Sequence, residues 1–352
     1  MCLFSNNSEE IKMACQKYLS DVPVIFIGSG FSVPYGLPTM ENLGNEIKEK
    51  IDFKYKELPE WKNFCVNLET TRSLERALSI GRFGEDLTKD IIKTTWNFIS
   101  EKDRQVYERL FNNSEDLAFS LKEVLLNLLE VHPRVVNIIT TNYDKVIEYN
   151  VDLVNAILNN GFKGQYKKFF SSFYTNKPTT KKVPVNLCDD KVVNLFKVHG
   201  SLDWFKERNS NQIFEFVNTK ELLDNYEPLI VTPGIEKYKE TYDEPYRSVI
   251  VQADDIMRKA KCFLCIGYGF NDSHIQPKLV DRINRNDVPI VIITKNLTTE
   301  ARNILKNVNN YLVFEESTLN PEETLVSFNG STVIEQGKIW KLENFIKYWF
   351  LE

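Results

Sequence analysis

The chain has 352 residues, of which 42% are hydrophobic and 26% charged, and its net charge is −5. This composition is ordinary for a globular protein, and it gives no general reason to expect a nucleic-acid-binding surface. The chain has no apolar run of about 18 residues, and no basic segment leads into an apolar one at its start, so we expect neither a membrane span nor a secretory signal. Six cysteines in a chain this long do not make a disulfide framework, which favours a reduced, cytoplasmic protein.

The first third of the chain is predicted to be mostly helical. A short buried strand covers residues 25–28 (IFIG), and after a Gly-Ser-Gly turn a helix is predicted from about Thr39. Residues 60–130 look helical throughout, with Ser114 as a plausible cap of the last helix. The apolar face of that helix consists of Leu117, Leu121, Val124, Leu125 and Leu128. Because this region interrupts the alternation of strands and helices, we predict an inserted helical subdomain at about 45–130.

The rest of the chain alternates between apolar strands and helices. Strands are predicted at 134–144, 192–200, 288–294 and 311–316, and at the start of 261–275. Helices are predicted at 144–161 with Gly161 at the end, at 277–285 and at 297–307, while 162–190 is predicted to be an irregular connection. Strands that are apolar throughout are typical of a parallel sheet with both faces covered. We therefore predict an α/β fold over residues 1–352, a single domain with a Rossmann-like parallel sheet covered by helices on both faces.

The C-terminal segment, residues 315–352, is predicted to hold a short EETLVSF element and an amphipathic helix. The helix is rich in aromatic residues, namely Trp340, Phe345, Tyr348, Trp349 and Phe350. These rings either dock a partner or another copy of the chain, or pack onto the domain as its last helix. The sequence leaves both readings open.

Polar residues follow four of the predicted strands. They are GSGFS (28–32), TTNYD (140–144), VHGSLDW (198–204) and GYGFNDSHI (267–275). Ligands of open parallel sheets bind at the carboxyl ends of the strands, so these four segments predict one binding crevice.

The GSGFS segment has two readings. It is either a tight turn into a helix or a pyrophosphate cradle, in which glycines let the backbone approach the phosphate. The dehydrogenase fingerprint G-x-G-x-x-G would need a glycine where Val33 stands, and no Gly-Lys-Ser/Thr follows as in a P-loop. The segment therefore indicates a nucleotide site without identifying the kind.

Three polar side chains at the strand ends are candidates for chemistry. Asp144 precedes a predicted helix and suits a cap, a role that does not exclude a ligand contact. Asn142 offers an amide that can hold a water molecule or a ribose hydroxyl without ionising. His199 stands at a strand end, where an imidazole is a natural general base. Of the two other histidines, we expect His132 to be structural or solvated and His274 to cap a helix.

Cys262 and Cys265 form a lone C-x-x-C pair inside an apolar strand, so one side chain should be buried on each face. A zinc ribbon needs a second pair at suitable spacing, and the remaining cysteines, at positions 2, 15, 65 and 188, do not supply it. We predict no structural zinc and no zinc ribbon.

In this order, the four motifs resemble the sirtuin superfamily. In sirtuins the counterparts are a G-A-G-x-S phosphate loop, a T-Q-N-x-D segment, an H-G motif and a Gly-rich turn that holds the ribose. The chain departs from the deacylase branch because it lacks the four-cysteine zinc ribbon. It also has Pro38, Thr39 and Met40 in place of an acidic–aromatic–basic run, and Thr141 in place of glutamine. These departures resemble the bacterial sirtuin-like domains of anti-phage defence systems, which hydrolyse NAD to nicotinamide and ADP-ribose.

The resemblance implies roles for individual residues. Asn142 would fix a ribose hydroxyl and the attacking water, Asp144 would contact the nicotinamide amide, and His199 would act as base. Residues implied to bind NAD are Gly28, Ser29, Gly30, Phe31, Ser32, Thr39, Thr141, Gly267, Tyr268, Gly269, Asn271 and Asn296. NAD is then the substrate, and no metal is implied.

The resemblance also implies that the NAD-hydrolysing activity is held off until it is triggered, and that partners take part in this control, since uncontrolled NAD loss kills the host. We expect a homo-oligomer, a separately encoded partner such as a HerA-like ATPase or a nucleotide-sensing protein, or both. The alternative functions are an NAD-dependent deacylase or ADP-ribosyltransferase, a non-catalytic NAD or ADP-ribose sensor, and a Rossmann oxidoreductase, which Val33 and the lack of a substrate domain disfavour.

A basic stretch at 162–197 is expected to be a solvated loop rather than a nucleic-acid contact. Its lysines are Lys163, Lys167, Lys168, Lys177, Lys181, Lys182, Lys191 and Lys197.

Overall fold

The computed structural model describes residues 4–71, 74–79, 81, 83–112, 119–171, 190–217, 219, 221–232, 243–272, 275–285, 287–328 and 330–350. Within these residues no helix is both long enough and apolar enough to cross a membrane. The expectations for Ser114, Leu117 and His274 fall outside the described residues.

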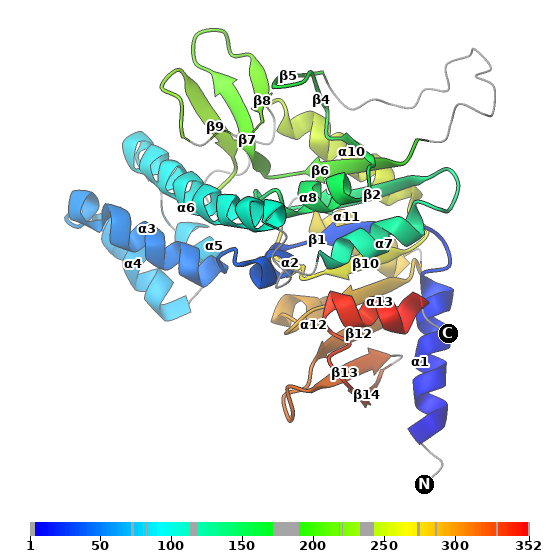
Figure 1. The fold of residues 1–352 in the computed structure, drawn as a ribbon. Coiled ribbons are helices and arrows are strands. Elements are labelled where there is room, and N and C mark those ends of the chain that lie inside the picture. The colour runs from blue at the N-terminus through cyan, green and yellow to red at the C-terminus, as the bar shows by residue number, and fades with distance from the viewer. Residues whose placement is uncertain are drawn as a thin grey trace.

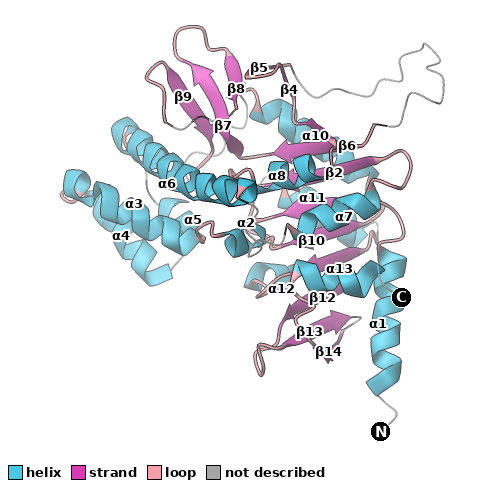
Figure 2. Ribbon diagram, in the orientation of Figure 1, coloured by secondary structure: helices cyan, strands magenta, loops and turns pink. Residues whose placement is uncertain are grey.

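The main sheet has nine strands among the described residues, in the order β14-β13-β12-β11-β10-β1-β2-β6-β3 (Figures 1 and 2). Its parallel strands are β1 (Val24–Ile27), β2 (Val135–Thr140), β3 (Ile157–Asn159), β6 (Val192–Lys197), β10 (Phe263–Ile266), β11 (Ile290–Ile293) and β12 (Tyr311–Glu316). Two antiparallel strands, β13 (Glu323–Phe328) and β14 (Ser331–Gln336), extend the sheet beyond β12. Strands β1, β10 and β11 are buried along their whole length, as the apolar runs predicted.

Helices cover both faces of the main sheet, which confirms the predicted fold class. One face carries α1 (Phe4–Tyr18), α7 (Ser120–Leu128), α8 (Val146–Leu153) and α13 (Leu342–Phe350). The opposite face carries α10 (Tyr246–Lys259), α11 (Gln276–Arg285) and α12 (Thr299–Leu305). Alternate residues of the strands enter the two cores: Ile25 and Ile27 lie in the first, and Val24 and Phe26 in the second.

The helical region between β1 and β2 begins with a short turn and continues as a layer of packed helices. The turn comprises α2 (Ser29–Ser32) and a 3-10 segment (Val33–Tyr35). The helices are α3 (Met40–Tyr55), α4 (Pro59–Thr71), α5 (Leu74–Ser79) and α6 (Glu85–Phe111). They pack on one another around Trp61, Phe64 and Leu68, beside the sheet (Figure 1). The predicted apolar face of α7 is buried, since Leu121, Val124, Leu125 and Leu128 are at most 5% exposed.

A second sheet that the sequence did not predict lies beside β6. It has five strands among the described residues, in the order β4-β5-β8-β7-β9 (Figure 2). They are β4 (Phe162–Lys163), β5 (Lys167–Phe170), β7 (Gly200–Glu207), β8 (Ile213–Phe216) and β9 (Tyr226–Ile230). The prediction of an irregular 162–190 was therefore wrong for β4 and β5, and residues 172–189 lie outside the described part.

The helix predicted at 144–161 was also too long. Helix α8 ends at Leu153, and Asn155 adopts a left-handed conformation with φ +52°. The chain then turns into β3, where the Ile157 N–H donates to the Lys191 carbonyl at 2.8 Å. Gly161 follows this edge strand instead of ending a helix.

The C-terminal aromatics pack onto the domain. Phe345 is 0% and Trp349 is 5% exposed, and the Phe345 ring centroid lies 5.2 Å from that of Phe314 in β12. Trp340, Tyr348 and Phe350 are half-buried against the same core. The structure thus favours the packing reading over the docking reading.

Candidate active site

The four predicted segments follow four adjacent strands whose ends lie level. The register pairs Ile266 of β10 with Ile27 of β1, Ile27 with Thr140 of β2, and Thr140 with Lys197 of β6. Asn142 and His199 each stand two residues beyond this row, on neighbouring strands. The sheet therefore brings the ends of all four segments to one edge, as predicted.

The first and fourth segments pack directly against each other at their glycines. A Cβ atom at Gly28 would lie 2.5 Å from the Gly267 carbonyl oxygen, and one at Gly267 would lie 2.4 Å from the Phe31 nitrogen. Gly267 also has φ +57°, which side chains rarely adopt. The Gly30 N–H donates to the Gly267 carbonyl at 3.1 Å, and the Phe31 N–H to the Gly28 carbonyl at 3.0 Å. The glycines are thus required by the contact between two turns, whatever they contribute to a phosphate site.

Asn142 connects the β2 end to the first turn. Its Nδ2 donates to the Gly28 carbonyl and to Ser32 Oγ, each at 3.0 Å. Because a carbonyl can only accept, the amide nitrogen must face Gly28, and Oδ1 is left as the acceptor. Among the described residues Oδ1 receives no hydrogen bond, so it can accept one from a water molecule or a hydroxyl.

Asp144 is buried in the same network. Its Oδ1 accepts from the Val146 N–H at 3.1 Å, as a helix cap would, and Ser32 also hydrogen-bonds to its carboxylate. Burial raises the pKa of Asp144 to about 6, although Lys197 acts in the opposite direction. The N-cap residue of α8 is Lys145, so Asp144 binds the first N–H group of the helix from the position before the cap, and it is 5% exposed.

Lys197 lies beneath the site and is fully buried. Its Nζ is 2.7 Å from Glu148 Oε1 and donates to the Asp144 carbonyl at 2.5 Å. Burial lowers the pKa of this ammonium, but the surrounding carboxylates, Glu148 first, raise it above its usual value. Burial likewise raises the pKa of Glu148 to about 7. The expectation that the basic stretch is solvated was wrong at this residue, because Lys197 belongs to a buried ion pair that supports the β2 and β6 ends.

His199 meets Asp272 of the fourth segment. Its Nε2 lies 2.7 Å from Asp272 Oδ2, and the two side chains are 10% and 5% exposed. The two atoms are at ion-pair distance, while the orientation of the ring leaves Nε2 without a well-aligned hydrogen bond among the described residues. Nδ1 has no hydrogen bond to a described residue either, and it is not among the fully enclosed polar atoms.

The other predicted ligand residues differ in what they can offer. The Phe31 side chain packs in the core against Tyr35, so only its backbone can face a ligand. The Tyr268 ring lies in the other core against Phe26, and Thr39 caps α3 by accepting from the Asn42 N–H.

Further predicted residues are at least partly accessible at the edge. Asn271 and Asn296 are exposed, and Ser29, Thr141 and Gly269 are half-buried. In the turn after β11, Thr298 rather than Asn296 binds the fourth segment, since its hydroxyl donates to the Gly269 carbonyl at 2.7 Å.

The sequence reasoning missed three residues of this region. Asp272 was passed over in favour of its neighbour Asn271, and the buried Lys197 was assigned to solvent. Asp103 of α6 was not considered, yet it accepts from the Lys145 N–H at 2.7 Å and from the Tyr149 hydroxyl at 2.7 Å. Lys197 and Asp272 are charged residues next to or within a predicted motif, which is a weak signal. Asp103 lies in no motif, so the sequence offers no signal for it.

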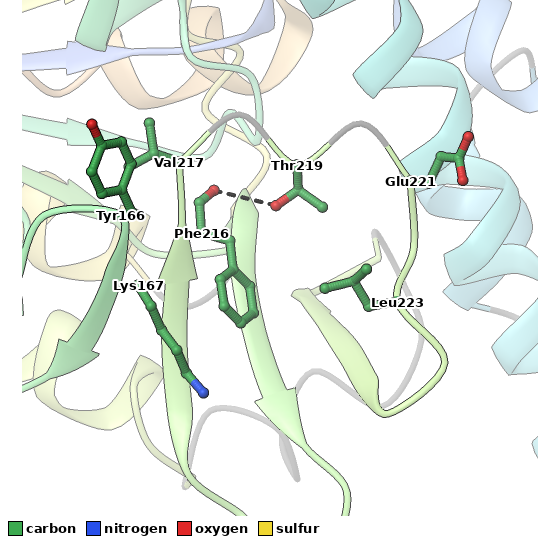
Figure 3. Close-up of a pocket in the computed structure, with 7 residues that line it drawn as sticks. All are labelled: Tyr166, Lys167, Phe216, Val217, Thr219, Glu221 and Leu223. Atoms are coloured by element: carbon green, nitrogen blue, oxygen red, sulfur yellow. Dashed lines mark hydrogen bonds between the residues drawn. The ribbon is translucent and has the colours of Figure 1, made fainter.

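Two cavities lined by described residues contain none of the predicted site residues. An open groove of about 570 Å³ at the end of the second sheet is bordered by Tyr166, Phe216 and Leu223 (Figure 3). A second cavity of about 250 Å³ lies between α6, α8 and β7 and is lined by Asp103, Tyr149 and other residues. No predicted site residue lines either cavity. Among the described residues, no group of three or more His, Cys, Asp or Glu side chains is arranged to hold a metal ion.

Comparison with known proteins places the chain in a family. The model of the SIR2-like domain matches residues 136–313, just over half of the chain, so the chain belongs to the SIR2-like domain family. Membership supports an NAD-utilising, sirtuin-like function. No curated protein matches the chain.

Solved structures similar to this one include several Sir2 proteins. A mutant Sir2 homologue in complex with ADP-ribose is 12% identical, with a TM-score of 0.47, over 96% of this chain and 95% of that chain. A complex of a Sir2 homologue with NAD is 14% identical, with a TM-score of 0.43, over 86% and 87% of the two chains. Likeness at this level says nothing about the site.

Proposed function

We propose that the chain is an NAD⁺ hydrolase that forms nicotinamide and ADP-ribose. The observation that carries this proposal is the pairing of strand ends at one edge, where Asn142 presents an acceptor, Oδ1, to which no described residue donates, beside the strand end that bears His199. Such an edge suits a reaction in which a water molecule must be held and deprotonated next to a sugar.

The residues of the edge fit the chemistry of this substrate. The C1′–N bond breaks with its electron pair leaving on neutral nicotinamide, because the ring starts as a cation. Water then attacks C1′ while its proton passes to the His199 imidazole. Asn142 Oδ1 would accept from the water or a ribose hydroxyl, and positioning rather than strong acid catalysis would supply the rate.

Asp144 fits its predicted role less directly. One carboxylate oxygen accepts from the Val146 N–H at the start of α8, and Ser32 also hydrogen-bonds to the carboxylate. We therefore propose that Asp144 acts mainly through the network that orients Asn142, and that a direct contact to the nicotinamide amide is secondary. Likewise Ser32, whose hydroxyl is already used twice inside the protein, would organise the site rather than grip the pyrophosphate.

The experiment is release of nicotinamide from NAD by the purified chain and its variants Asn142→Ala and His199→Ala. Asn194→Ala is the matched control, because Asn194 lies on β6 and bonds Asn137 and Asn159 away from the strand ends. Release by the wild type and the control, and none by the two site variants, would support the proposal. Full activity of either site variant would contradict the assignment of the site.

If the isolated wild type releases no nicotinamide, calorimetry with NAD and ADP-ribose measures whether it binds either nucleotide. Binding by the wild type that is lost in Asn142→Ala would indicate that the nucleotide binds at this edge of the sheet. The chain would then be either an enzyme held inactive or a non-catalytic sensor. Failure to bind either nucleotide would overturn the proposal. An acetylated-peptide assay separates hydrolysis from the deacylase alternative, and transfer of labelled ADP-ribose to protein separates it from the ADP-ribosyltransferase alternative.

We further propose that the enzyme is an effector of cytoplasmic anti-phage defence that depletes NAD on activation. Its restraint would come from self-association or from a separately encoded partner, for which a HerA-like ATPase or a nucleotide-sensing protein is the expectation. Co-purification from cells that carry the neighbouring genes, followed by NAD measurement during infection, would test this role.

A further inference from the structure

We propose that Asp272 positions His199 by holding the proton on Nε2, so that Nδ1 is the nitrogen that acts as the base. This inference rests on the proposed hydrolysis of NAD, and it deepens that proposal by naming the atom that takes the proton. It assigns to Asp272 the role of a positioning residue that acts through the imidazole.

The geometry on which this rests joins two segments that are far apart in the sequence. His199 follows β6 and Asp272 follows β10, and their facing atoms, Nε2 and Oδ2, are 2.7 Å apart. Both residues are buried, at 8% and 5% exposure, so solvent does not compete for the contact. Hydrogen bonds of catalytic groups are often poorly aligned before the substrate binds, and a small rotation of the imidazole would align this one.

Asp272 is itself held rigidly. Its Oδ1 accepts from the Ile275 N–H at 2.9 Å, and its carbonyl accepts from the Gln276 N–H at 3.0 Å at the start of α11. A carboxylate is favourable at a helix N-terminus because it interacts with the free N–H groups and the helix dipole. With one oxygen bound to the helix, only Oδ2 is directed to His199.

The carboxylate decides which imidazole nitrogen can react. A carboxylate only accepts, so it selects the tautomer with hydrogen on Nε2 and leaves the lone pair on Nδ1. Neither ring nitrogen has a well-aligned hydrogen bond to a described residue, but Nε2 is fully buried against Asp272 and Nδ1 is not fully buried. In the reaction the water proton moves to Nδ1 as the water oxygen bonds C1′, and the resulting imidazolium is stabilised by Asp272.

Asp272→Asn is the informative variant because it reverses this selection while keeping the shape. The Ile275 N–H still requires an acceptor, so the amide oxygen stays there and the NH₂ group faces His199. That donor requires a lone pair on Nε2 and therefore moves the imidazole hydrogen to Nδ1. The equivalent substitution in a serine-hydrolase triad lowers kcat by roughly 10⁴-fold through the wrong tautomer.

The test is ¹⁵N NMR of histidine-labelled protein at a pH where the imidazole is neutral, together with steady-state kinetics. The chain has only three histidines, and His199→Gln assigns the signal. We expect a protonated Nε2 in the wild type, a protonated Nδ1 in Asp272→Asn, and a fall in kcat of roughly 10²- to 10⁴-fold with KM changed by no more than about 3-fold. Asp254→Asn is the control, since Asp254 pairs with Lys278 between α10 and α11 and lies outside the site.

The outcomes separate this inference from the function on which it rests. A wild type with the hydrogen on Nδ1, or an Asp272→Asn variant with unchanged tautomer and kcat, would overturn the inference even if NAD is hydrolysed. If the imidazole hydrogen is on Nε2 in the wild type and on Nδ1 in Asp272→Asn, but the protein neither hydrolyses nor binds NAD, the proposed function is overturned. The interaction of Asp272 with His199 is then still supported.

Discussion

Asn142 Nδ2 lies 3.0 Å from the Gly28 carbonyl oxygen, so the β2 end and the turn after β1 are joined by a hydrogen bond whose direction is fixed. The same amide group donates to Ser32 Oγ, and the Gly28 carbonyl also accepts from the Phe31 N–H. The side chain therefore has a structural role in addition to the proposed catalytic one.

Replacing Asn142 with Asp should separate the two roles through pH. An ionised carboxylate at position 142 would face the Gly28 carbonyl oxygen and could not donate to it, which raises the pKa of that carboxylate and leaves the Phe31 N–H as the donor to this carbonyl among the described residues, whereas the protonated acid can still donate. We expect Asn142→Asp to be less stable than the wild type by about 1–3 kcal/mol at neutral pH and to approach it as the pH falls through the raised pKa. Urea denaturation at several pH values measures this, and a pH-independent difference would contradict the assigned amide orientation.

The contact between the two glycine turns gives a matched pair of substitutions. Gly267 and Gly36 both have positive φ, at +57° and +96°, but a Cβ atom at Gly267 would clash with the Gly30 and Phe31 backbone, while none would at Gly36. Gly36→Ala should cost about 1 kcal/mol for the backbone conformation, and Gly267→Ala substantially more, about 3 kcal/mol or above. Equal urea midpoints for the two variants would show that the turns do not touch as described.

The sequence predicted the main sheet well because its strands are covered on both faces. Uninterrupted apolar runs, such as Ile290–Ile293, are visible without knowing their neighbours. The second sheet was missed because its strands mix charged and aromatic residues, as in Lys167–Phe170, and because β5 pairs antiparallel with β8, which is distant in the sequence. No local pattern reports such pairing.

The candidate site was predicted in its location but not in its partners. The carboxyl ends of adjacent parallel strands lie at the same edge of a sheet, so the sequence was enough to predict that Asn142 and His199 lie at one edge. Which polar residue of the fourth segment faces them depends on the turn, where Phe270 adopts φ +57°. This conformation leaves Asn271 exposed and turns Asp272 inward, and a sequence pattern does not encode that choice.

The packing of the C-terminal helix predicts a large cost for removing its central ring. Phe345 is 0% exposed, whereas Phe53 of α3 is 78% exposed and serves as the control for losing a phenyl group from a helix. Phe345→Ala should lower the free energy of unfolding by about 3–5 kcal/mol, and Phe53→Ala should change it by no more than about 0.5 kcal/mol. A cost below about 1 kcal/mol for Phe345→Ala would contradict the packing and restore the docking reading for this helix.

The buried pair of Lys197 and Glu148 should make stability depend on pH. Burial raises the pKa of Glu148 from 4.5 to about 7, so between these values the folded protein binds more protons than the unfolded chain. Stability contributed by this group is therefore present below its unfolded pKa and is lost as the pH rises through its folded pKa. The size of the loss is of the order of 3 kcal/mol, since one pKa unit corresponds to about 1.4 kcal/mol.

Glu148→Gln removes this titration while leaving an oxygen to accept from Lys197 Nζ. Compared with the variant, the wild type should lose about 3 kcal/mol of relative stability between about pH 4.5 and 7, with little further relative change above that. Urea denaturation of both proteins across this range measures the difference, and Glu227→Gln controls for the loss of a carboxylate, because the pair of Glu227 with Arg208 is exposed. If the wild type and Glu148→Gln keep a constant difference across this range, folding does not raise the pKa of Glu148, and Lys197 then pairs with an ionised carboxylate beneath the site at neutral pH.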